Sequence, residues 1–218
     1  MRIAIRALIA DDHELFRSGL KQLLVDVLQA GDVREAETLD QALETLTNEG
    51  AGDLILVDLR MPGMSGVEAL SALRDGFPDA KVAVVSAWED RGDILAALGA
   101  GVHGYIPKSL PSAEIAGAIR SILEGRIFVP PSVGRRESGR AEPPASSGSV
   151  SSNNALGQDK LTSRQKEVLT ELLKGQASKE IARTLDIAEG TVKIHLAAIY
   201  RALGVRTRAE AIARLKSH

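Results

Sequence analysis

Apolar and polar positions follow a repeating order along the first 125 residues. Short apolar runs are typical of strands buried on both faces of a parallel sheet, and they predict strands at 3–10, which is apolar apart from Arg6, and at 54–57, 81–86 and 103–106. A weaker strand is predicted around Val33. Between them apolar residues recur every three or four positions, which predicts helices at 15–28, 39–48, 66–75, 90–100 and 112–124. Five strand–helix units predict an α/β fold with a doubly wound parallel sheet.

Polar residues stand where the predicted strands end. They are Asp11 and Asp12, Asp58, Ser86 and Lys108. The carboxyl ends of parallel strands share one edge of the sheet, so we expect these side chains to converge. Three neighbouring carboxylates need a cation to offset their repulsion, and oxygen ligands favour Mg²⁺ or Mn²⁺. With a hydroxyl and an ammonium beside it, such a pocket suits phosphoryl transfer to a carboxylate nucleophile.

Each of these residues also has an ordinary structural interpretation. Asp11 could cap the first helix, and Asp58 could cap the next helix or turn the chain. Ser86 could simply end a strand, and Lys108 could be a solvated loop lysine. His13 invites interpretation as a metal ligand, but we take it as the start of the first helix.

Composition separates the chain into three parts. Residues 129–158 hold seven Ser, four Gly and four Pro with almost no apolar periodicity, which is typical of a flexible linker. The net charge is −8 before this segment, +1 within it and +5 after it, which suggests a cation partner for the front and a polyanion for the tail. The chain has no cysteine and no apolar run long enough to span a membrane, so we expect a soluble protein of a reducing compartment.

The tail has the pattern of a helix-turn-helix. Thr162 and Gln165 form a capping box before an amphipathic helix, and Ser178 starts a second, short helix. After a brief turn, a third helix is predicted over 191–203, and a short helix followed by a turn and a longer helix is the DNA-binding arrangement.

The third helix has two distinct faces. One face is apolar and should pack the core: Val192, Leu196, Ile199 and Leu203. The opposite face could enter a major groove: Lys193, Ile194, Ala197 and Arg201. The alternative is an ordinary amphipathic helix with solvated charges.

The motifs at the strand ends resemble those of bacterial response-regulator receiver domains over residues 3–124. The matching segments are 11–12, 58 with 61–63, 86–87 and 104–108. The resemblance implies a flavodoxin-like fold with sheet order 2-1-3-4-5 and phosphorylation of Asp58 by a histidine kinase. It implies that Asp12, Asp58 and the backbone carbonyl of Arg60 bind Mg²⁺, with Asp11 helping through water.

The same resemblance assigns the phosphoryl-responsive residues. Lys108 would pair with the phosphoryl oxygens and Ser86 would shift toward them. Tyr105 would follow that shift and change the surface of the fourth helix, fifth strand and fifth helix, although without this context it is more often a core residue. One departure is Ser109, where many receivers have a cis proline, so the loop is either trans or strained. Arg60 and Trp88 flank the site.

The tail closely resembles the LuxR-type helix-turn-helix over residues 160–216, and the pairing matches NarL/FixJ response regulators. The implied DNA contacts are Lys179, Thr191, Lys193, Ile194, Ala197 and Arg201, and the implied dimerisation residues are Ala209, Ile212 and Ala213. Ala188 stands where the family often has a capping serine, so Gly190 or Thr191 could cap the third helix instead.

We therefore hypothesise a cytoplasmic, DNA-binding response regulator that is not an enzyme and that is a homodimer when active. Its domains would be a receiver at 1–128, a linker at 129–158 and a DNA-binding domain at 159–218. The alternatives are a Mg²⁺-dependent phosphatase with an aspartyl intermediate and a transcription factor whose receiver no longer needs phosphate.

Overall fold

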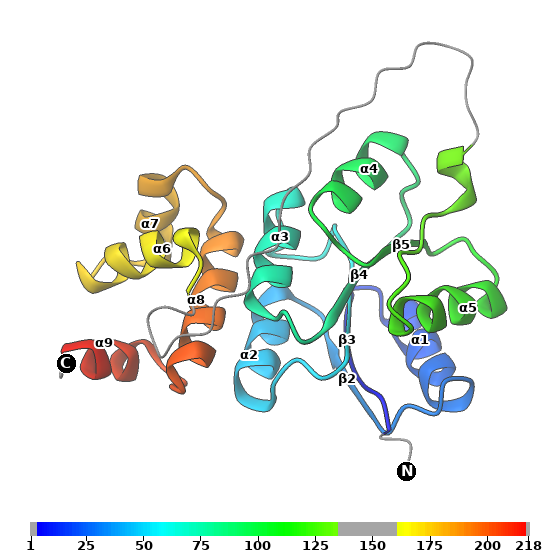
Figure 1. The fold of residues 1–218 in the computed structure, drawn as a ribbon, viewed down its shortest axis with the longest axis horizontal. Coiled ribbons are helices and arrows are strands. Elements are labelled where there is room, and N and C mark those ends of the chain that lie inside the picture. The colour runs from blue at the N-terminus through cyan, green and yellow to red at the C-terminus, as the bar shows by residue number, and fades with distance from the viewer. Residues whose placement is uncertain (1–3, 135–160, 217–218) are drawn as a thin grey trace.

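The computed structural model describes residues 4–134 and 161–216. Its centre is a parallel sheet with strand order β2-β1-β3-β4-β5, which confirms the predicted topology (Figure 1). The strands are β1 (Arg6–Ala10), β2 (Asp32–Ala36), β3 (Leu54–Val57), β4 (Lys81–Ser86) and β5 (Gly104–Pro107).

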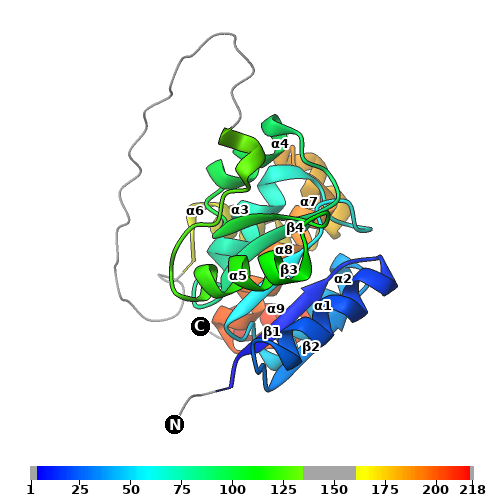
Figure 2. The same ribbon diagram turned by 90° about the vertical axis from the view of Figure 1, so that its right-hand side faces the viewer.

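Helices cover both faces of the sheet (Figures 1 and 2). The helices of this domain are α1 (Glu14–Asp26), α2 (Leu39–Glu49), α3 (Gly66–Gly76), α4 (Arg91–Gly99) and α5 (Ser112–Leu123). The residues of α1 and α5 share one apolar cluster, and those of α2, α3 and α4 share the other.

The two clusters explain why the central strands are apolar without interruption. In β3, Leu54 and Leu56 point into the α1/α5 cluster, whereas Ile55 and Val57 point into the α2/α3/α4 cluster. Successive side chains of a strand alternate between faces, so a strand covered on both sides needs an apolar residue at every position.

Residues 161–216 form a separate small helical domain. Its helices are α6 (Ser163–Leu173), α7 (Ser178–Leu185), α8 (Glu189–Leu203) and α9 (Arg208–Lys216). The predicted capping box of Thr162 and Gln165 is confirmed. Helix α8 begins two residues earlier than predicted, with Ala188 at its N-cap. The expectation that Gly190 or Thr191 caps it is therefore wrong, because both lie inside its first turn.

The predicted linker lies only partly within the described residues. A short 3₁₀ helix, η1 (Pro131–Gly134), follows the sheet domain, and Val133 packs against the α2/α3/α4 cluster. The rest of the predicted linker, from 135 to 158, lies outside the described residues. Over the ranges 4–134 and 161–216, none of the helices combines the length and the apolar character needed to cross a bilayer.

Candidate functional site

The structure brings Asp11, Asp58 and Lys108 together at the carboxyl edge of the sheet. The Lys108 ammonium lies 2.7 Å from Asp11 Oδ2 and 2.9 Å from Asp58 Oδ2. The side chains are 9%, 2% and 3% exposed for Lys108, Asp11 and Asp58, so the ion pairs are largely shielded from water. Backbone hydrogen bonds hold the three residues in line with the sheet: Asp11 N–H to Ala36, Asp58 N–H to Ala10 and Lys108 N–H to Ser86.

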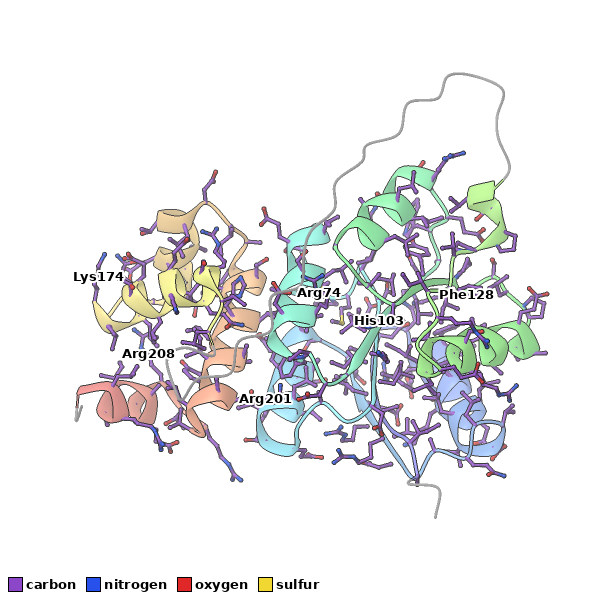
Figure 3. All side chains as sticks on the ribbon, in the orientation of Figure 1. Arg74, His103, Phe128, Lys174, Arg201 and Arg208 are labelled. Atoms are coloured by element: carbon purple, nitrogen blue, oxygen red, sulfur yellow. The ribbon has the colours of Figure 1, made fainter. Side chains whose placement is uncertain are left out.

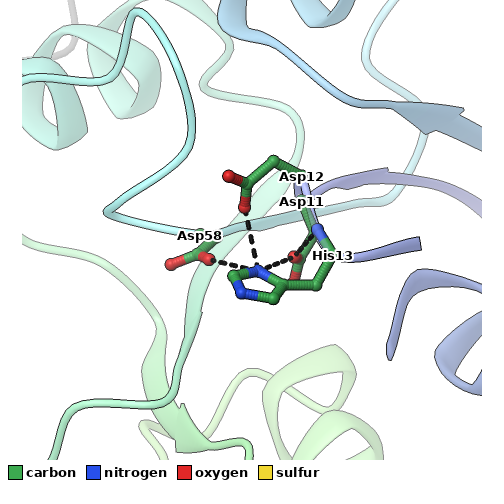
Figure 4. A group of neighbouring side chains, drawn as sticks. All are labelled: Asp11, Asp12, His13 and Asp58. Atoms are coloured by element: carbon green, nitrogen blue, oxygen red, sulfur yellow. Dashed lines mark hydrogen bonds and ion pairs between the residues drawn. The ribbon is translucent and has the colours of Figure 1, made fainter. Parts of the chain in front are cut away.

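Asp12 and His13 complete a cluster above this ion pair (Figure 4). His13 Nδ1 lies 2.9 Å from Asp12 Oδ1, 3.3 Å from Asp11 Oδ1 and 3.8 Å from Asp58 Oδ2. One candidate ligand atom from each of these four residues lies within 4.8 Å of all the others. His13 is the N-cap of α1, as its predicted place at the helix start requires, but its ring turns back toward the carboxylates.

Ser86 ends β4 and Tyr105 lies in β5, and both are fully buried. Ser86 Oγ accepts a hydrogen bond from the Trp88 backbone N–H, and the Tyr105 hydroxyl donates to the Trp88 carbonyl at 2.7 Å. Burial raises the pKa of the Tyr105 hydroxyl above its ordinary value. The Trp88 carbonyl thus holds the Tyr105 side chain in an inward position.

Arg60 and Trp88 lie against each other, two residues beyond Asp58 and Ser86. The Arg60 backbone N–H donates to Asp58 Oδ1 at 3.1 Å, and its guanidinium lies 5.1 Å from the centre of the Trp88 ring. The Lys108–Ser109 peptide bond is trans, since the described residues contain no cis bond. Of the two possibilities for this loop, the structure has the trans one.

Sequence reasoning missed Arg17, which hydrogen-bonds to the backbone of the carboxylate cluster. This buried side chain of α1 donates to the Asp11 carbonyl at 2.7 Å and to Glu37 Oε1 at 2.8 Å. A charged residue between Phe16 and Leu20, on the core side of an amphipathic helix, was the available signal. Arg17 fixes the backbone from which the carboxylates of Asp11 and Asp12 project.

The second candidate site is the face of α8 that was predicted to enter a major groove, and it lies against the sheet domain. Helix α8 packs on α2 and α3, which belong to the receiver-like sheet domain (Figure 1). Ile194 is fully buried and Ala197 is 5% exposed, and both join the α2/α3/α4 apolar cluster. The opposite face packs the core of the small domain through Val192, Leu196, Ile199 and Leu203, as predicted.

Both cations of this face pair with acidic residues of the sheet domain. Lys193 Nζ lies 2.9 Å from Asp40 Oδ2 in α2. Arg201 binds Asp79 at 2.7 Å and the Gly76 carbonyl at 3.1 Å, and its guanidinium lies over the Phe77 ring. Figure 3 labels Arg201 at the boundary between α8 and the sheet domain. The four residues predicted to meet a polyanion thus meet acidic and apolar groups of the same chain.

The remaining predicted contacts are dispersed. Lys179 is exposed on α7, and Thr191 is buried, with a hydroxyl that finds no hydrogen-bond partner among the described residues. On α9, Ala209 and Ala213 are exposed and Ile212 is half-buried, so these three predicted dimerisation residues reach the surface of the small domain.

His195 lies at the contact between the two domains. It is buried in α8, facing Asp75 and Glu68 of α3 and Arg164 and Glu167 of α6. Burial and then the charge of Arg164 lower its pKa below 6.5, despite the opposing carboxylates of Asp75 and Glu167.

We expect the free energy of unfolding to decrease as the pH falls from about 7.5 to about 5.5, because the unfolded chain protonates this histidine first. The stabilisation is complete above the unfolded-state pKa and is lost as pH falls through the lowered folded-state pKa. The pKa of His103 is also lowered, so His103 contributes a pH dependence of the same sign. Urea unfolding of the wild type and of His195→Gln at both pH values therefore isolates the contribution of His195. A pH dependence that His195→Gln leaves unchanged would contradict this assignment.

Comparisons with known proteins agree on both domains. Residues 7–120 match the model of the response regulator receiver domain, and residues 159–215 match that of bacterial regulatory proteins of the luxR family. The glycerol metabolism activator of Pseudomonas putida is 39% identical over 207 residues, covering 95% of this chain and 93% of the relative. The nitrate/nitrite response regulator NarL of Escherichia coli is 32% identical over 207 residues, covering 94% and 91%.

A solved structure has the same architecture along the whole chain. The RcsB response regulator of Salmonella typhimurium superposes with a TM-score of 0.56 over 99% of each chain, at 21% sequence identity. At this identity the likeness shows a shared fold and nothing more. The chain belongs to the NarL/FixJ-type response regulators, transcription regulators in which a receiver domain precedes a LuxR-type DNA-binding domain.

Proposed function

We propose that Asp58 accepts a phosphoryl group from a sensor histidine kinase and that this modification controls DNA binding. The observation that carries the proposal is the shielded Asp58 carboxylate, held 2.9 Å from the Lys108 ammonium beside two further carboxylates. In the transfer, an Asp58 oxygen attacks phosphorus, the bond from phosphorus to the kinase histidine breaks, and an acyl phosphate forms. The histidine leaves as neutral imidazole.

The residues present fit a divalent cation. Asp12, Asp58 and the Arg60 carbonyl would hold Mg²⁺ or Mn²⁺, with Asp11 acting through water, since hard cations take oxygen ligands of this kind. When bound, the cation offsets the negative charge that accumulates on the phosphoryl group. Lys108 binds phosphoryl oxygens and Ser86 donates a hydrogen bond to them, which stabilises the acyl phosphate.

Docked α8 explains how the resting protein is kept from DNA. Its major-groove face is covered by α2 and α3, so a duplex cannot reach Lys193 or Arg201 until the domains separate. Phosphorylation adds about −1.5 to −2 charge at Asp58. Release of the docked domain is then the event that frees the DNA-binding face.

The loop between β3 and α3 joins the two sites most directly. It begins at Asp58, and its Pro62 carbonyl accepts the backbone N–H of Leu39 at the start of α2. Its Gly63 carbonyl lies so close to Gly190 of α8 that a β-carbon on Gly190 would come within 2.0 Å of it. A rearrangement of this loop around a phosphoryl group therefore presses on the first turn of α8.

This route differs from the one that the resemblance implies. Helix α8 packs on α2 and α3 and not on the α4–β5–α5 surface (Figure 1). We assign the release of α8 to the β3–α3 loop, with Ser86 binding the phosphoryl group and Tyr105 following the shift of Ser86.

We propose the further partners from the family and the surface. The released domain binds double-stranded DNA through Lys179 of α7 and five residues of α8: Thr191, Lys193, Ile194, Ala197 and Arg201. A second copy pairs through α9 at Ala209, Ile212 and Ala213, because a readout face with only two long cations calls for two half-sites. A regulator of chromosomal promoters acts in the cytoplasm. The proposed domain limits are 1–128 and 159–218, joined by 129–158.

Incubation with acetyl phosphate and Mg²⁺ tests the first step. Intact-mass spectrometry should find one added phosphoryl group on the wild-type chain and none on Asp58→Ala. Equal modification of both proteins would refute Asp58 as the acceptor. If the protein instead releases phosphate continuously from small phosphoesters, and the rate does not follow the fraction of protein phosphorylated on Asp58, the result would favour a phosphatase.

A further inference from the structure

We propose that His13 is an additional ligand of the divalent cation at the carboxylate cluster. Its imidazole nitrogen makes the site select a first-row transition ion such as Mn²⁺ over Mg²⁺. The inference rests on the metal site proposed above and concerns which ion that site takes.

The distances around His13 Nδ1 are those between neighbouring ligands of one ion. Ligand atoms about 2.1 Å from an ion lie about 3.0 Å apart at right angles and about 4.2 Å apart across it. The three carboxylate oxygens nearest Nδ1 lie 2.9, 3.3 and 3.8 Å from it, and they come from Asp12, Asp11 and Asp58 (Figure 4). The imidazole nitrogen and the Asp12 and Asp58 oxygens, which lie within 4.8 Å of one another, can therefore close on one ion through small side-chain movements, with Asp11 acting through water.

The ring of His13 has no evident role in the helix that it starts. Asp, Asn, Ser and Thr cap helices with a side-chain oxygen, whereas the His13 ring makes no capping hydrogen bond within the described part of the chain. Its side chain is 64% exposed, so it does not serve the core either. Instead, the His13 backbone N–H donates to Asp11 Oδ1 at 2.9 Å, which holds this segment turned over the cluster.

A cation already lies beside this nitrogen. The Lys108 ammonium, which pairs with Asp11 and Asp58, is 3.5 Å from His13 Nδ1. The ring thus adjoins the two buried carboxylates, and unlike them it is accessible to solvent.

The imidazole nitrogen of His13 determines which divalent ion the site prefers. Mg²⁺ keeps oxygen ligands and water, whereas imidazole nitrogen suits the first-row transition ions, whose affinity for mixed nitrogen and oxygen sites rises along the series from Mn²⁺. A site of carboxylates alone discriminates weakly between Mg²⁺ and Mn²⁺. One nitrogen ligand shifts that balance toward Mn²⁺.

Isothermal titration of the metal-free full-length chain with Mn²⁺ and with Mg²⁺ tests the proposal. We expect His13→Ala to weaken Mn²⁺ binding about tenfold or more, since even groups behind a ligand change metal affinity by about 10–100-fold. Mg²⁺ binding should change by less than about twofold. Glu14→Gln, which removes a neighbouring charge in the first turn of α1, is the matched control and should leave both affinities unchanged.

A change in affinity does not by itself show that His13 binds the ion directly, so a spectroscopic measurement is added. Pulsed electron paramagnetic resonance of bound Mn²⁺ should detect coupling to a directly bound imidazole nitrogen in the wild type and lose it in His13→Ala. A wild-type spectrum without nitrogen coupling, or His13→Ala with both affinities unchanged or equally reduced, would overturn the proposal. Asp12→Asn tests the metal site itself, separately from the role of His13, because it should abolish binding of both ions. Wild-type protein that binds neither ion would contradict the metal site itself.

Discussion

Gly76→Ala is expected to release the DNA-binding domain and to raise the affinity for double-stranded DNA without any phosphorylation. Gly76 ends α3 at the surface that α8 covers, and an added β-carbon would lie 2.8 Å from the Ala198 β-carbon. Overpacking of this kind costs about 1–3 kcal/mol, which corresponds to a shift of roughly 5- to 150-fold in the docking equilibrium. The receiver itself should not suffer, because alanine favours a helix over glycine by about 1 kcal/mol.

The compensating change makes this prediction specific. Ala198→Gly removes the opposing β-carbon, so the double variant Gly76→Ala/Ala198→Gly should dock again and return to low DNA affinity. Gly117→Ala in α5 is the matched control, since a β-carbon there has open space. Fluorescence anisotropy with labelled duplexes measures all four proteins at one salt concentration. If Gly76→Ala binds DNA no better than Gly117→Ala, the docked arrangement does not limit DNA binding.

Lys108→Met is expected to lower the free energy of unfolding by about 3 kcal/mol at neutral pH in the absence of metal. The substitution keeps an unbranched apolar side chain but removes the ammonium that lies over the Phe16 ring, and it leaves Asp11 and Asp58 as buried carboxylates without their cation. Removing one partner of a buried ion pair typically costs about 3–5 kcal/mol, because an uncompensated charge remains in the interior. Urea unfolding in a chelating buffer measures the change.

Two further variants separate this cause from general damage to the protein. Lys108→Met/Asp58→Asn should recover a large part of the loss, because it removes one of the repelling charges. Lys21→Met breaks an exposed pair with Glu35 and should cost less than about 1 kcal/mol. If the double variant is as unstable as Lys108→Met, the loss does not come from repulsion between the carboxylates.

The sheet and its site could be predicted because both follow from local patterns. Unbroken apolar runs locate the buried strands, and parallel topology then requires Asp11, Asp58 and Lys108 to meet at one edge. The two faces of α8 could be predicted for the same reason, since a period of 3.6 separates Val192 and Leu196 from Lys193 and Ile194.

What the second face of α8 contacts could not be predicted from local patterns. The docking of Ile194 and Ala197 against α2 and α3 depends on contacts between residues more than 100 positions apart. An apolar and basic face suits both a duplex and an acid-rimmed protein surface, so its pattern does not distinguish the two. The roles of Arg17 and of the inward Tyr105 likewise depend on hydrogen bonds to distant carbonyl groups.

Energy transfer between the two domains tests the central claim most directly. The chain has no cysteine, so dyes can be placed at Arg120→Cys in α5 and Arg183→Cys in α7, both exposed. Addition of beryllofluoride with a divalent cation, as a phosphoryl mimic, should lower the transfer efficiency in this protein and leave it unchanged when Asp58→Ala is also present. Unchanged transfer with beryllofluoride bound at Asp58 would contradict release of α8 by phosphorylation.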